Sequence, residues 1–133
     1  MKSKTEQLNK ELERKEKIET ECKRLKKLYK GFPKAKKDAL EGLINDSAFM
    51  KVMLEEIRID LLKNDMFEIF EQGSQRFERE RPQAKTYSTY IQKYAGVQKQ
   101  LIDLLPQEEQ KKEKSELDQF MQKGNEIRCK KRT

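Results

Sequence analysis

The sequence predicts a mainly α-helical protein, built as a small helical domain with a long amphipathic helix toward its C-terminus and with charged flexible arms at both ends. The chain has 133 residues, of which 41% are charged. Of its 29 Leu, Ile, Val and Phe residues, 20 lie between residues 40 and 105. They recur there mostly at steps of three and four, the period of a helix with one buried face. We therefore expect a basic helical arm over 1–37, a helical core over 38–105 and a charged tail over 106–133.

The first element should be a helix over residues 3 to 30, which contain strong helix formers and neither Gly nor Pro. Its apolar stripe is interrupted, so the helix is only weakly amphipathic. Gly31 and Pro33 should end it, because Gly suits the position after a helix and Pro cannot continue one. Pro33 can equally occupy the first position of the next helix.

Two further helices are expected between Pro33 and residue 63. Apolar residues have helical spacing up to Ile44, where Asn45 and Asp46 predict a break. Asp46 or Ser47 could then cap the third helix. Apolar residues recur every four positions within it and predict a broad buried face: Phe49, Met53, Ile57 and Leu61.

Residues 66 to 78 are compatible with two structures. A helical period continues through Met66, Ile69, Gly73 and Phe77. The turn signals Asn64-Asp65 and Gln72-Gly73-Ser74 instead favour a short β-hairpin. Periodicity alone does not decide between them.

The clearest element is a helix that begins at Pro82 and is closed by Pro106. Its apolar face spans more than five turns and consists of Tyr87, Tyr90, Ile91, Tyr94, Val97, Leu101, Leu104 and Leu105. The tyrosines are predicted to pack in the core with their hydroxyls at its rim. Stacking on nucleic-acid bases is the alternative.

The tail after Pro106 contains one amphipathic segment, predicted as a short helix over 115–123. Ser115 can cap it, and three apolar residues cluster on one face: Leu117, Phe120 and Met121. A helix this short is marginal alone. These three residues are therefore candidate anchors for docking into a groove of a partner, and a frayed tail without contacts is the alternative.

The net charge of +7 is concentrated in one stretch of the chain. Residues 22 to 37 carry eight basic side chains and no acid: Lys23, Arg24, Lys26, Lys27, Lys30, Lys34, Lys36 and Lys37. Such a run indicates contact with a polyanion such as DNA, or merely a solvated helix face. Lysine predominates, which favours phosphate contact over bidentate recognition of guanine.

Composition argues against several functional classes. The chain has no His, its five Gly are scattered, and its two Cys are far apart. A catalytic triad, a phosphate-binding glycine loop and a disulfide framework are therefore not expected. We expect no enzymatic activity, no metal, no cofactor and no membrane association. A core of about 66 residues is small enough that oligomerisation often completes it.

The core region resembles the bacteriophage terminase small subunit family. The start of the third expected helix, Ala48-Phe49-Met50, fits the family pattern, as do Phe70 and Gly73 of the following segment. Gln72 stands where the family usually has Asn. The long helix matches at Tyr87, Ile91, Tyr94, Leu101, Leu104, Leu105 and Pro106, and the tail matches at Leu117-Asp118-Gln119-Phe120.

This resemblance implies a non-catalytic subunit of a DNA-packaging machine in the host cytoplasm. Such a subunit forms a ring, binds double-stranded viral DNA and delivers it to the large terminase subunit, whose ATPase and nuclease activities it regulates. The resemblance also favours an extended or hairpin conformation for residues 66–78. The alternative function is a structural helical oligomer or scaffold without a nucleic-acid role.

Overall fold

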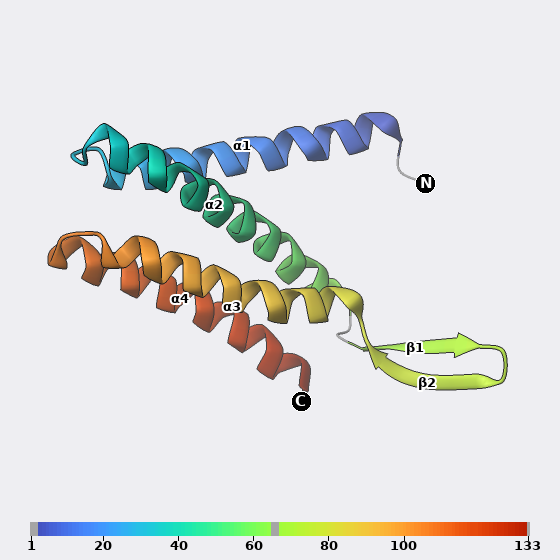
Figure 1. Cartoon of the computed structure of the whole chain (residues 1–133). Helices are drawn as coiled ribbons and strands as arrows, with labels where there is room; N and C mark the ends of the chain where they lie inside the picture. Colours follow the sequence, from blue (N-terminus) through green and yellow to red (C-terminus); the bar gives the residue numbers. More distant parts are fainter. Residues whose placement is uncertain (1–2, 65–66, 133) are drawn as a thin grey trace.

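Four helices and one β-hairpin form the protein in this computed structural model, which describes residues 3–64 and 67–132. The elements are α1 (Lys4–Leu28), α2 (Lys34–Lys63), β1 (Phe67–Gln72), β2 (Gln75–Glu80), α3 (Pro82–Asp103) and α4 (Gln107–Arg132). Successive helices run antiparallel, and the hairpin extends beyond them at one end (Figure 1). The predicted mainly helical fold class is confirmed.

Helix α1 begins where Ser3 accepts a hydrogen bond from the Glu6 backbone amide at 3.2 Å. Its first half is exposed, including Leu8 and Leu12. Its last turn is partly buried: Leu25 is 1% exposed and the adjoining Tyr29 is 2% exposed, whereas Lys26 and Lys27 face solvent. The expectation of a flexible basic arm is therefore wrong for this region, because Leu25 and Tyr29 anchor it in the core.

Helix α2 is continuous from Lys34 to Lys63, so the predicted break at Asn45 and Asp46 is wrong. The residues that follow, Ser47 and Ala48, are fully buried. The Gln98 side-chain amide of α3 donates a hydrogen bond to the Ser47 hydroxyl. Tertiary packing of this turn outweighs the weak helix propensity of Asn and Asp.

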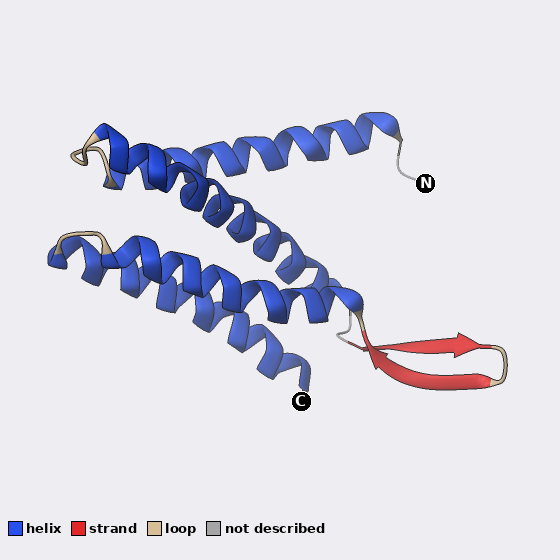
Figure 2. Ribbon diagram, in the orientation of Figure 1, coloured by secondary structure: helices blue, strands red, loops and turns tan. Residues whose placement is uncertain are grey.

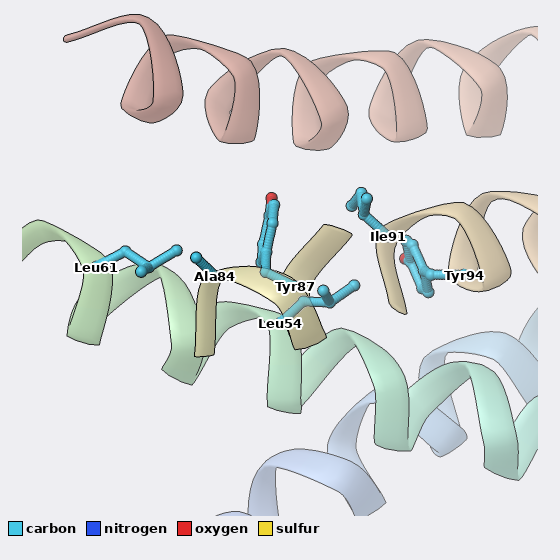
Figure 3. Close-up of a cluster of buried hydrophobic side chains, with 6 residues drawn as sticks. All are labelled: Leu54, Leu61, Ala84, Tyr87, Ile91 and Tyr94. Carbon is cyan, nitrogen blue, oxygen red and sulfur yellow. The ribbon is translucent and has the colours of Figure 1, made fainter. Parts of the chain in front are cut away.

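One buried cluster joins the second half of α2 to the first half of α3 (Figure 3). It consists of Leu54, Leu61, Ala84, Tyr87, Ile91 and Tyr94. Tyr87 and Tyr94 are each 3% exposed. Core packing of these two tyrosines is thereby confirmed, and neither ring is accessible for stacking on a base.

A second buried cluster lies at the opposite end of the helices and includes the end of α1. It consists of Leu25, Tyr29, Leu40, Ile44, Leu101 and Leu105. Leu104, which was expected on the same apolar face, is instead 47% exposed and is the C-cap of α3. The apolar core is thus divided between two sites along the helical bundle.

The segment between α2 and α3 is an antiparallel hairpin in which Phe70 lies opposite Phe77 and Gln72 lies opposite Gln75. The two-residue loop begins with Gly73, whose φ of 61° is a conformation that Gly adopts without strain. The hairpin interpretation is confirmed. The second strand ends at Glu80, two residues beyond the predicted boundary, and Met66 lies outside the described residues.

The sequence predicted a flexible tail that contains a short helix over 115–123, but the structure has the long helix α4 there. It is one helix of 26 residues that packs along α3 and also contacts α2. Leu117, Phe120 and Met121 pack against the cluster of Figure 3. The tail prediction is wrong because these apolar residues find their groove within the chain itself.

Candidate nucleic-acid interface

A concave, lysine-lined surface lies where the end of α1 faces the start of α2. Its volume is about 630 Å³, and its lining comprises Lys23, Lys26, Lys27, Tyr29, Lys30, Lys37, Asp38, Glu41 and Ile44. We call this surface the lysine groove. The short connection through Gly31 and Pro33 folds α2 back against α1, which brings lysines from both helices together.

The floor of the lysine groove is firmly packed. The Tyr29 hydroxyl donates a hydrogen bond to the Leu101 carbonyl oxygen of α3. Its ring also packs edge-on against Phe32, with the ring centroids 5.2 Å apart. Burial, followed by the nearby charge of Glu113, raises the pKa of Tyr29 to about 12. The floor is therefore neutral at physiological pH.

The charge of the lysine groove is strongly positive. Its lining has five lysines against two acids, Asp38 and Glu41. Lys26 Nζ lies 4.0 Å from Glu41 Oε1, and both side chains are more than half exposed, so that ion pair is weak. Within the described part of the chain, the other four lysines have no acidic group within salt-bridge distance. They are positioned to bind an anion from solvent.

Arg24 is not part of the lysine groove, although the sequence placed it among the candidate DNA-binding residues. It faces α4, where Arg24 Nη2 lies 2.7 Å from Glu21 Oε1 and Nη1 lies 3.2 Å from Glu113 Oε2. Hydrogen bonding to Glu21 raises the pKa of this already basic group further. Because successive helical residues point about 100° apart, Arg24 leaves the face that its lysine neighbours share.

The remaining two predicted DNA-binding residues, Lys34 and Lys36, are exposed at the start of α2 but do not line the groove. Lys36 Nζ lies 5.9 Å from the centre of the Phe32 ring. Both belong to the rim of the basic end of the molecule. Five of the eight predicted residues thus converge on the lysine groove, two flank it and Arg24 is turned away.

The predicted docking residues of the tail are engaged inside the molecule. Phe120 packs on Tyr94 with the ring centroids 5.3 Å apart, and the guanidinium of Arg58 lies 3.7 Å from the centre of the Phe120 ring. Arg58 also donates a hydrogen bond to the Phe120 carbonyl oxygen. Docking of Leu117, Phe120 and Met121 on a partner would require this part of α4 to leave its own groove.

A network of charged groups joining α1, α2 and α4 was not predicted from the sequence. Glu21 is 8% exposed and Glu113 is 6% exposed, and each accepts from Arg24. Lys51 of α2 adds a further contact, with its Nζ 3.4 Å from Glu21 Oε2. These partners are up to 89 residues apart in the chain, and no local pattern indicates such a pairing.

Among the residues that the structure describes, no group of His, Cys, Asp and Glu could hold a metal ion. None of the described helices has an apolar stretch of sufficient length to span a membrane.

Searches against protein-family models, curated proteins and solved structures find no match to this chain.

Proposed function

We propose that the chain is the small terminase subunit of a phage DNA-packaging machine, and that its lysine groove binds the backbone of double-stranded viral DNA. The observation that carries this proposal is the convergence of five lysines on one concave surface, three from α1, Lys30 from the turn that follows it and Lys37 from α2. Lysine side chains on such a surface neutralise phosphates and release counterions. Residues 38 to 121 resemble terminase small subunits, and this resemblance indicates that the bound polyanion is viral DNA.

In this proposal the protein forms a ring in the host cytoplasm and delivers DNA to the large ATPase/nuclease subunit. It contributes no catalytic group of its own and regulates that subunit by contact. Because Phe120 and its apolar neighbours pack inside the molecule, we assign the contact to the outward, charged face of α4. Stimulation of the large subunit's ATPase by wild-type protein, and its loss on charge reversal of Lys111 and Lys114, would test this assignment.

The test of DNA binding is the dependence of affinity on salt concentration. Substitution of Lys23, Lys27, Lys30 and Lys37 by Gln should flatten the slope of log affinity against log salt by about 3 to 4 units, at about 0.9 per lost phosphate contact. The loss should be equal on two unrelated duplexes, because phosphate contacts carry no sequence information. Arg24 is left unchanged because its ion pair with Glu113 connects α1 to α4.

A matched control removes four exposed lysines elsewhere: Lys15, Lys85, Lys99 and Lys111, each changed to Gln. This control has the same net charge as the groove variant and should keep most of the wild-type slope. Equal slopes for the two variants would refute a localised site.

The second candidate function is a structural helical oligomer without a nucleic-acid role. Several large apolar side chains, among them Phe49, Ile59 and Leu62 on α2, are about half exposed and favour association with another protein surface. Absence of DNA binding at low salt, together with a stable oligomer, would select this function over the first.

A further inference from the structure

The β-hairpin stands apart from the helical body. Its sheet has only two strands, and it projects past the ends of α2 and α3 (Figure 2). A two-stranded hairpin is marginally stable at best in water unless a third strand or another element packs against it. The hairpin therefore requires a partner surface, or it remains the weakest element of the fold.

The two faces of the hairpin differ. On one face Phe70 packs on Phe77, with ring centroids 5.2 Å apart, and Arg79 covers the Phe70 ring at 4.2 Å. Alternation along the strand places Phe67 and Ile69 on the other face. These two side chains are 48% and 60% exposed. The second face thus presents an apolar pair that stays about half exposed among the described residues, and Phe77 on the first face is exposed to a similar extent, 49%.

A concave surface of about 500 Å³ lies between α2 and α3, away from the hairpin. Its lining comprises Asp46, Phe49, Met50, Tyr90, Lys93, Gly96, Val97 and Gln100. Phe49 is 47% exposed there, and a Cβ on Gly96 would meet no atom within 4 Å. We call this surface the α2–α3 groove; it is apolar, open and roomy enough for aliphatic and aromatic side chains.

The charges of the hairpin and of α3 are opposite in sign. Residues 67–80 carry four Glu and two Arg, a net charge of −2. Helix α3 carries three Lys and one Asp, a net charge of +2. The lining of the groove itself holds one charge of each sign, Lys93 of α3 and Asp46 of α2. Opposite potentials steer association and fix its register.

We infer that the Phe67 and Ile69 face of the hairpin binds in the α2–α3 groove of a second copy of this chain. The hairpin and the groove are different surfaces of the chain. When two copies bind, one of them therefore still has a free groove and the other a free hairpin. Such a head-to-tail contact continues from copy to copy and closes into a ring when the rotation permits. This inference names the contact that would build the ring of the proposed function. It rests on ring formation and does not depend on DNA binding.

Cysteine cross-linking between copies tests this contact. In a background with Cys22→Ser and Cys129→Ser, one variant carries Ile69→Cys and a second carries Gln100→Cys, an exposed position of the groove. Mixed under mild oxidation, the two should form a disulfide-linked dimer, and neither should do so alone. A chain that carries both cysteines should give a ladder of covalent multimers.

Three outcomes would overturn the inference. Cross-linking of Ile69→Cys with itself would indicate pairing between hairpins. Stronger cross-linking to a Lys30→Cys variant would place the acidic hairpin in the lysine groove. Only dimers from the doubly substituted chain would indicate reciprocal exchange in place of a head-to-tail contact.

Native mass measurement provides an independent readout that does not need a disulfide. Ile69→Ser should reduce the oligomer to monomers at concentrations where the wild type stays assembled. The control Leu8→Ser removes a similarly exposed apolar side chain outside both surfaces and should leave the mass unchanged. A monomeric wild type, or equal masses for the three proteins, would refute the inference, while the salt slope of DNA binding decides the proposed function separately.

Discussion

The two ends of this molecule are stabilised in different ways. At the lysine-groove end, Leu25, Tyr29 and Leu101 form a buried floor beneath the charged side chains. At the hairpin end, two strands pair only with each other, and Phe67 and Ile69 stay about half exposed. A buried floor fixes the shape of a binding surface before any ligand arrives. A bare hairpin gains its stability from what it binds.

If the lysine-groove end is the more firmly packed of the two, the largest loss of stability is expected on truncation of Leu101, in the floor of the lysine groove. Leu101→Ala should lower the free energy of unfolding by about 2–5 kcal/mol, as expected for a truncated buried leucine. Leu104→Ala, three residues later and 47% exposed, should cost less than about 0.5 kcal/mol. Urea melts of both variants measure the difference. Similar losses for the two would show that this end of α3 is not the packed floor described above.

A second large effect is expected at Gly124, where α4 crosses Tyr87. A Cβ at this position would collide with the Tyr87 hydroxyl and approach Arg58 Nη2 to 3.0 Å. The Tyr87 hydroxyl cannot move freely, because it accepts a hydrogen bond from Arg58 Nε at 2.9 Å. Gly124→Ala should therefore destabilise by about 1–3 kcal/mol.

Helix propensity alone predicts the opposite sign, since Ala is favoured over Gly by about 1 kcal/mol in a helix interior. Thermal unfolding of Gly124→Ala thus distinguishes a docked α4 from a detached one. Gly96→Ala, in α3 with open space around its Cβ position, is the matched control and should be neutral or stabilising. A stabilising Gly124→Ala would support the flexible tail that the sequence suggested.

The contrast between the two ends also explains which features could be predicted from sequence. The long helix beginning at Pro82 and the separation of α1 from α2 around Gly31 and Pro33 follow from local periodicity and from Pro and Gly. The continuity of α2 through Asn45 does not, because it depends on burial of Ser47 against Gln98 of another helix. Local rules describe an element well until a distant contact outweighs them.

The candidate site also has features that follow from local sequence and features that depend on distant contacts. The lysines of the groove could be selected from the sequence, because charge density is a local property. Two things could not be predicted: the pairing of Arg24 with Glu113 and the packing of Phe120 on Tyr94. Helical geometry already takes Arg24 off the face of its lysine neighbours, but its partner Glu113 lies 89 residues later in the chain. The sequence predicted that the apolar face of α4 docks on a partner, whereas in the structure it packs against α2 and α3 of the same chain.

The pH dependence of stability should report on the floor of the lysine groove. The pKa of Tyr29 is raised to about 12, and that of an unfolded tyrosine is about 10. The neutral phenol is favoured in the folded protein, so its stabilising contribution is complete below pH 10 and is lost as the pH rises through 12. By pH 11 the loss should be about 1 kcal/mol.

Tyr29→Phe isolates this contribution, because lysine titration is common to both proteins. The gap in unfolding free energy between wild type and Tyr29→Phe should narrow by about 1 kcal/mol from pH 8 to pH 11. A gap that stays constant over this range would show that the Tyr29 hydroxyl is solvated.

The smallest effect is expected at the hairpin in the dilute protein. If Phe67 and Ile69 have no partner within the chain, Ile69→Ser should change the unfolding free energy of the monomer by less than about 0.5 kcal/mol. At higher concentration the wild type should gain thermal stability by mass action, and Ile69→Ser should not. Melting temperatures over a hundredfold dilution series measure both effects. If Ile69→Ser lowers the unfolding free energy by more than about 1 kcal/mol at the lowest concentration, the hairpin already packs on helices of its own chain. The two ends of the molecule would then differ less in packing than the exposure of Phe67 and Ile69 indicates.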